Sequence, residues 1–201
     1  MGLSCDVRDY AATREALETA AGRFGAIDFV VSGAAGNFLV PALGMSANAF
    51  RTVVDIDLNG TFNVFRACYD LLRRPGASLI AISAGQAVNP VLQQAHVGAA
   101  KAGVNQLVRS LALEWGSEGV RVNCLSPGPI DGTEGMARLT PHPSAAAARA
   151  ARIPLRRYGT IQEVAHCAVF LLSDAAAYVT GAILACDGGA QLAPTTNLAS
   201  P

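Results

Sequence analysis

The sequence lacks the features that mark proteins that bind nucleic acid or cross membranes. Its 15 basic and 15 acidic residues cancel, so nothing indicates nucleic acid or an acidic membrane surface as a partner. No apolar stretch approaches the about 20 residues that a membrane-spanning helix needs. Neither end resembles a signal peptide or a peroxisomal S-K-L signal. We therefore expect a cytoplasmic protein that binds neither nucleic acid nor membranes.

Paired cysteines and clustered histidines are also missing. The five cysteines are odd in number, widely spaced and never in a C-x-x-C pair, which argues against a disulfide framework and for reduced thiols. The three histidines share no metal-ligand spacing, so we expect no metal site. The residues concerned are Cys5, Cys68, Cys124, Cys167, Cys186, His96, His142 and His166.

The sequence is instead rich in apolar segments of regular length. Hydrophobic residues make up 51% and charged residues only 15%, a balance typical of a parallel sheet that is covered on both faces. Strands are expected at 27–32, 77–83, 120–125 and 182–186, and helices at 9–24, 46–74, 94–115 and 162–172. This alternation predicts an α/β fold with a Rossmann-type, doubly wound parallel sheet. We expect one domain, 1–190, with a C-terminal tail, 191–201, and a mobile helical lid in the alanine-rich stretch 141–152.

Small and polar residues follow each of the four expected strands. The clusters occupy residues 32–37, 83–85, 126–129 and 187–189. Ligands of open α/β sheets bind outside the carboxyl ends of the strands, and glycine lets a ligand approach the backbone closely. Any one cluster also fits an ordinary turn, but the four together predict a cleft of dinucleotide size.

Asp57 is the most informative acidic residue. In a helix its neighbours are Val53, Val54, Gly60 and Thr61, which places the carboxyl group on the inward-facing stripe. A buried carboxyl group that holds a proton near neutral pH is a suitable proton donor. The alternative is a carboxylate that hydrogen-bonds a backbone turn.

Each of three further charged residues has two possible roles. The ammonium group of Lys101 either extends to the surface or holds a ribose hydroxyl and stabilises negative charge in the cleft. Asp187 either caps a turn or faces the site. Asp6 either reaches a cofactor ring or caps the first helix.

Five motifs together make the sequence resemble the short-chain dehydrogenase/reductase family. They are CDV at 5–7, AAG at 34–36, Lys101 of the family's Y-x-x-x-K motif, RVN-x-L-x-PGPI at 121–130 and VTG-x-x-L-x-x-DGG at 179–189. The stretches 34–42, 53–64 and 127–135 resemble the peroxisomal-type 2,4-dienoyl-CoA reductases in particular. That resemblance implies NAD(P)H-dependent reduction of 2,4-dienoyl-CoA thioesters in fatty-acid β-oxidation, by hydride transfer followed by protonation.

The sequence departs from the general family pattern at the catalytic positions. Val97 stands where the family has its tyrosine, Ala84 where it has its serine, and Asp57 where it has its asparagine. Tyrosine-based carbonyl reduction is therefore not expected. In the dienoyl-CoA reductases, the acids matched by Asp57 and Asp187 deliver a proton with the help of water, and the lysine matched by Lys101 binds the nicotinamide ribose. The resemblance thus makes these three the catalytic residues.

The resemblance also implies a cofactor, a substrate and a partner. NADPH is the implied cofactor, although no residue present separates it from NADH, and no metal is implied. The substrate is an acyl-CoA, and the two long helices imply a homo-oligomer, either a dimer or a tetramer. The implied cofactor-binding residues are Asp6, Val7, Ser32, Ala34, Ala35, Gly36, Lys101, Pro127, Gly128 and Ile130. The implied substrate-binding residues are Asn37, Phe38, Ser83, Thr133 and Glu134, with the lid over the acyl chain.

The family's glycine-rich turn, T-G-x-x-x-G-x-G, follows none of the expected strands. Because this turn and two strands precede the CDV segment in the family, we expect a fold that is truncated at its N-terminus. The first two strands and the backbone cradle for the pyrophosphate would then be absent. Two alternatives to dienoyl-CoA reduction stay open: another enone or CoA-thioester reductase of the family, and a non-catalytic remnant that only oligomerises.

Overall fold

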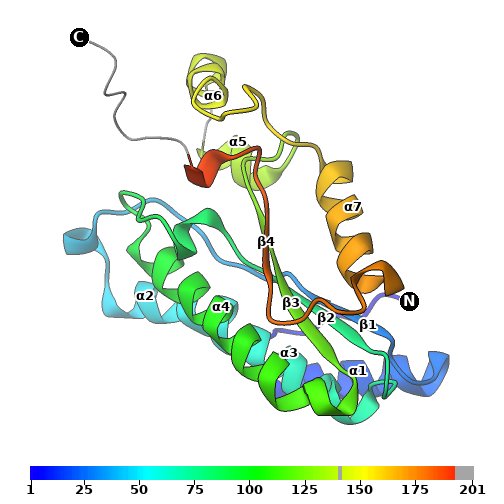
Figure 1. Ribbon diagram of the computed structural model, residues 1–201. Helices are drawn as coiled ribbons and strands as arrows, with labels where there is room; N and C mark the ends of the chain where they lie inside the picture. Colours follow the sequence, from blue (N-terminus) through cyan, green and yellow to red (C-terminus); the bar gives the residue numbers. More distant parts are fainter. Residues whose placement is uncertain (140–141, 193–201) are drawn as a thin grey trace.

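The computed structural model describes residues 1–139 and 142–192. At its centre lies a sheet of four parallel strands in the order β1-β2-β3-β4 (Figure 1). Val30 pairs with Leu79, which in turn pairs with Val122. The predicted Rossmann-type parallel sheet is thereby confirmed. The strands are β1 (Phe29–Ser32), β2 (Ser78–Ile82), β3 (Arg121–Pro127) and β4 (Ile183–Cys186).

Helices cover both faces of this sheet (Figure 1). α4 and α3 pack side by side on one face, and α7 packs on the other face. Outside the first pair, α1 packs against α3 and α2 packs against α4. In the described part of the chain, no helix has the length and hydropathy to cross a membrane. The helices are α1 (Tyr10–Phe24), α2 (Ala47–Val54), α3 (Gly60–Cys68), α4 (Ala95–Trp115), α5 (Glu134–Leu139), α6 (Pro143–Ala150) and α7 (Ile161–Leu172).

Local sequence signals set the helix ends. Asp9, Ser46 and Thr160 are the N-caps of α1, α2 and α7, and each side chain accepts a backbone N–H of the first helical turn. Glu163 completes a capping box with Thr160. α1 ends before Gly25, whose φ of 85° suits a residue without a Cβ.

The long helix expected at 46–74 is interrupted. A π-helical turn, Asp55–Asn59 (η2), separates α2 from α3, and the helical structure ends at Leu71. A π turn accommodates one extra residue, which an α-helical repeat in the sequence does not reveal. α5 was not expected because its six residues are too few to show a repeat. α6 lies within the expected lid; residue 141 of the lid and residues 193–201 of the tail lie outside the described residues.

Two apolar clusters lie on opposite faces of the sheet. Neighbouring residues of a strand point to opposite faces, and both Leu79 and Ile80 of β2 are fully buried. β1 differs, because Phe29 and Val31 are 54% and 52% exposed whereas Val30 between them is buried. One cluster contains Phe65, Leu79, Val104 and Val122, and the other contains Ile80, Leu125 and Leu171.

Candidate active site

Asp57 occupies the π-helical turn η2 and is fully buried. Its Oδ1 accepts the backbone N–H of Gly36 at 2.7 Å, which ties the helix to the loop that follows β1. The inward orientation predicted from the helical repeat is confirmed. Such π turns occur frequently at functional sites because they aim a side chain away from the regular helical direction.

Lys101 on α4 is the charged partner of Asp57. Its Nζ lies 3.2 Å from Asp57 Oδ2 and donates a hydrogen bond to Ile82 O at 2.9 Å. The Lys101 side chain is only 5% exposed, so the alternative in which it extends to the surface is wrong. Two opposite charges thus compensate each other inside the protein, at the carboxyl end of β2.

A chain of side-chain amides links the loop that follows β1 to the start of α4. Gln86 Nε2 donates to Gln94 Oε1 at 2.9 Å, and Gln94 Nε2 donates to Asn37 Oδ1 at 2.8 Å. Gln94 is buried. The chain fixes the amide of Asn37, with its oxygen toward Gln94 and its nitrogen away from it. Sequence reasoning assigned Asn37 to the substrate site but missed both glutamines, which no motif marks.

His96 lies two residues beyond Gln94 and was assigned no role. Its ring stacks on Phe38 with 4.3 Å between the ring centroids and 29° between the planes. The imidazole is fully buried, and neither ring nitrogen has a hydrogen-bond partner within the described residues. Burial lowers the pKa of His96, so the ring is neutral near pH 7. It therefore acts here as a flat, uncharged support for Phe38.

Two serine hydroxyls assigned to the site are held inside the fold. Ser83 Oγ donates to Asn105 Oδ1 at 2.6 Å, and Ser32 Oγ donates to Thr61 Oγ1 at 3.4 Å. Both serines are buried. Ala34 and Ala35, in contrast, are exposed on the loop after β1. This loop therefore offers its backbone, rather than the Ser32 hydroxyl, to a ligand.

The segment that precedes α1 lies over the start of α3. Val7 O accepts a hydrogen bond from Asn63 Nδ2 at 2.9 Å, and a Cβ at Gly60 would lie 2.6 Å from Val7 Cγ2. Asp6 pairs with Arg8, whose hydrogen bonds lower the pKa of Asp6 to about 2. Because Asp9 caps α1, the alternative in which Asp6 is the cap is wrong.

The loops after β3 and β4 meet at Gly128. A Cβ at Gly128 would lie 2.6 Å from the Cα of Asp187, so only glycine permits this contact. The carboxylate of Asp187 accepts the backbone N–H groups of Gly189 and Gln191 at 2.9 and 2.8 Å. Asp187 therefore caps a turn, and it also lines a cavity of about 500 Å³ that Ile130 shares.

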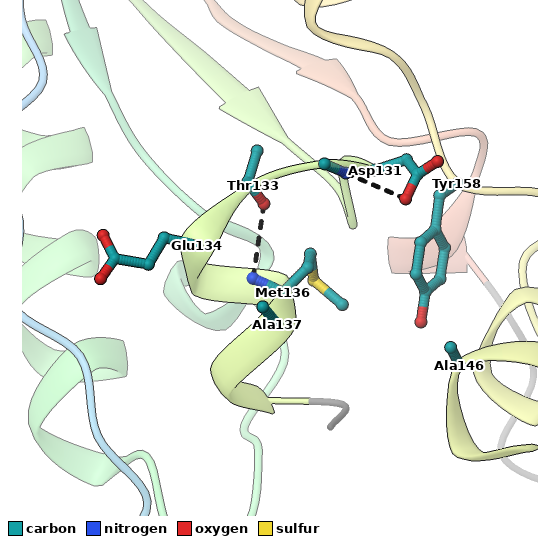
Figure 2. A pocket seen from close by; sticks show the side chains of 8 residues that line it. Asp131, Thr133, Glu134, Met136, Ala137, Ala146 and Tyr158 are labelled. Carbon is teal, nitrogen blue, oxygen red and sulfur yellow. Dashed lines mark hydrogen bonds between the residues drawn. The ribbon is translucent and has the colours of Figure 1, made fainter. Parts of the chain in front are cut away.

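A second cavity, of about 530 Å³, lies between the loop after β3, α5 and α6 (Figure 2). Thr133 and Glu134, for which the family resemblance implies substrate binding, line it together with Met136, Ala146 and Tyr158. Figure 2 shows Glu134 pointing away from Tyr158. Among the described residues, no group of three or more His, Cys, Asp or Glu side chains could hold a metal ion.

Comparison with known proteins gives consistent matches along the chain. The family model described as enoyl-(acyl carrier protein) reductase matches residues 1–191. A peroxisomal 2,4-dienoyl-CoA reductase of Pongo abelii is 46% identical over 191 residues, which are 94% of this chain and 65% of that protein. The enzyme of that name from Arabidopsis thaliana is 40% identical over 208 residues, 98% of this chain and 70% of that protein.

Solved structures share the fold. The gluconate 5-dehydrogenase of Burkholderia cenocepacia, solved in complex with NADP and tartrate, superposes with a TM-score of 0.86 at 26% identity. The match covers 94% of this chain and 74% of that one. The chain spans 65% of the length of the Pongo abelii relative, less than two thirds.

Proposed function

This chain belongs to the short-chain dehydrogenase/reductase family, whose enoyl-(acyl carrier protein) reductase model matches residues 1–191, and we propose that it reduces 2,4-dienoyl-CoA thioesters with NADPH. The observation that carries the proposal is the buried Asp57, held by Gly36 N–H and Lys101. Val97 and Ala84 occupy the positions of the family's tyrosine and serine, so an aspartate-based site replaces the tyrosine-based one. The relatives described above are named for dienoyl-CoA reduction.

A bound nicotinamide cofactor would supply the hydride, and the residues present fit its nicotinamide–ribose half. The ammonium group of Lys101 has three N–H donors, of which Ile82 O takes one and Asp57 Oδ2 lies within reach of a second. The third is left for a ribose hydroxyl. At Gly128 the missing side chain makes room for Asp187, which brings the loop after β3 against the loop after β4. We assign cofactor binding to Lys101, the loop 32–36 and the loop 127–130.

Asp57 is the proposed centre of proton delivery. Because Gly36 N–H occupies Oδ1, we assign proton handling to Oδ2, which has no hydrogen bond within the described residues. We assign to Oδ2 the uptake of a proton from water and its transfer to the reduced substrate, a transfer that returns Asp57 to the carboxylate paired with Lys101. Asp187 would act through water, since its oxygens already accept two backbone N–H groups.

We also propose that the chain forms a homo-oligomer through α2, α3 and α4. Phe50, Phe62 and Leu113 on these helices are exposed. Large apolar side chains that gather on one surface are typical of protein–protein contacts. No partner residue is needed for the site as described.

Replacement of Asp57 by Asn tests the function. Asn keeps the size of the side chain but cannot release a carboxyl proton, so we expect NADPH-dependent turnover of a 2,4-dienoyl-CoA to fall by about 10²- to 10⁴-fold. Asp55→Asn is the matched control, two residues away in the same turn, where the carboxylate only accepts a hydrogen bond from Asn59. Its turnover should stay near that of the unchanged protein.

Three results would contradict the proposal in different ways. Near-normal turnover by Asp57→Asn would remove Asp57 from proton delivery. Turnover of other enones but not of dienoyl-CoA would point to another reductase of the family. Absence of both NADPH binding and turnover in the unchanged chain would exclude the enzyme function.

A further inference from the structure

The buried hydroxyl group of Tyr158 stands without a partner in the part of the chain that the structure describes. Its Oη is shielded from solvent and has no hydrogen-bond partner within the described residues. The side chain lines the cavity of about 530 Å³, and Figure 2 shows the ring beside α6, with its hydroxyl directed toward Ala146. A buried hydroxyl without a partner is unfavourable, so this group stands out from the rest of the cavity.

Three other side chains of this cavity have polar partners within the chain. Thr133 Oγ1 donates to Ile130 O at 2.9 Å, and Asp131 Oδ1 accepts from Gly132 N at 2.9 Å. Glu134 pairs with Arg138 on the exposed side of α5. Unlike these groups, the Tyr158 hydroxyl has no hydrogen bond within the described residues.

The backbone holds Tyr158 firmly in this position. Asp131 N donates to Gly159 O at 2.9 Å and Gly159 N donates to Pro129 O at 3.0 Å, which joins the segment to the loop after β3. On the other side, Thr160 begins α7 with a capping box. These bonds fix the backbone of Tyr158 beside the cavity.

We propose that the Tyr158 hydroxyl donates a hydrogen bond to a carbonyl oxygen of a bound acyl-CoA. This inference rests on the proposed function, which supplies the acyl-CoA. The carbonyl belongs either to the thioester or to a pantetheine amide, and in both cases a phenol O–H is a suitable donor. Met136, Ala137 and Ala146 give the adjoining surface its apolar character, which suits the methylene groups on either side of such a carbonyl.

The test is Tyr158→Phe, which removes only the hydroxyl, with binding of hexanoyl-CoA and of free CoA to the full chain measured by calorimetry. We expect the Kd of the variant for hexanoyl-CoA to rise by about 3- to 10-fold. A rise for both ligands places the acceptor in the pantetheine arm, and a rise for hexanoyl-CoA alone places it in the thioester. Tyr178→Phe is the matched control, since Tyr178 is 104% exposed, and should bind both ligands as the unchanged protein does.

The melting temperature of the ligand-free variant separates ligand binding from a role in the fold. Because the hydroxyl has no partner among the described residues, its loss should leave the melting temperature unchanged or raise it. A lower melting temperature, or an unchanged Kd for hexanoyl-CoA, would overturn the inference and leave the proposed function intact. If the unchanged chain binds neither ligand, the proposed function fails and this inference fails with it.

Discussion

Two ion pairs near the candidate site differ in how far water reaches them. The buried pair, Asp57 with Lys101, joins side chains that are 0% and 5% exposed. The exposed pair, Glu163 with Arg157, joins side chains that are 42% and 54% exposed, beside Tyr158. Charges without water must be compensated by the chain itself, whereas exposed charges keep their hydration when a partner is lost. The stability of the fold should therefore depend more on the buried pair, which belongs to the candidate site, than on the exposed pair.

Loss of one charge should therefore matter far more in the buried pair. We expect Lys101→Met to lower the free energy of unfolding by about 3–5 kcal/mol, because it leaves the Asp57 carboxylate buried without a counter-charge. Arg157→Met makes the matching change in the exposed pair and should cost much less. Urea denaturation of both variants measures the two losses.

The double variant Asp57→Asn/Lys101→Met sharpens this comparison. Removing both charges should restore part of the stability lost in Lys101→Met, because no uncompensated charge remains inside. If Lys101→Met lowers the free energy of unfolding no more than Arg157→Met, burial does not make the Asp57 pair more important for stability than the exposed pair.

The amide chain should give an intermediate effect. Gln94→Leu removes the link between Gln86 and Asn37 and leaves one donor and one acceptor without partners, so we expect a loss of about 1–2 kcal/mol in the free energy of unfolding. It should also raise the KM for dienoyl-CoA more than it lowers kcat, because Asn37 loses its fixed orientation. Gln106→Leu, at an exposed position of the same helix, is the control and should stay within about 0.5 kcal/mol. Equal effects of the two substitutions would show that the amide chain neither stabilises the fold nor fixes the orientation of Asn37.

Sequence reasoning located the residues whose environment is set locally. Asp57 was placed inward by the helical repeat, and Ser46 and Thr160 cap helices as their residue types predict. The cap of α1 is Asp9, whereas Asp6 was the candidate from the sequence. A cap needs only the next three residues, so a short window of sequence contains the whole interaction.

Contacts between distant segments could not be predicted in this way. Lys101 Nζ meets Asp57 Oδ2 across 44 positions, and Gln94 meets Asn37 across 57. Hydrophobic patterns predict which face of an element is buried, not which side chain of another element it will contact. The burial of the Tyr158 hydroxyl was missed for the same reason. The π turn at Asp55–Asn59 was missed because one extra residue does not alter the α-helical repeat visibly.

The exposed pair should contribute little to stability, and its contribution should depend on pH. Hydrogen bonds from Arg157 and from the Thr160 backbone hold the pKa of Glu163 at about 2, below its ordinary value of 4.5. A carboxyl group whose pKa is lower in the folded than in the unfolded state stabilises the fold above the unfolded value. That stabilisation is lost as pH falls from 4.5 to about 2.

We therefore expect the melting temperature of Glu163→Gln to lie slightly below that of the unchanged protein at pH 7. The difference should shrink through this acidic range, and added salt should also shrink it, since exposed charges are screened. A difference that stays constant across this pH range would show that Glu163 acts through its cap geometry and not through its charge.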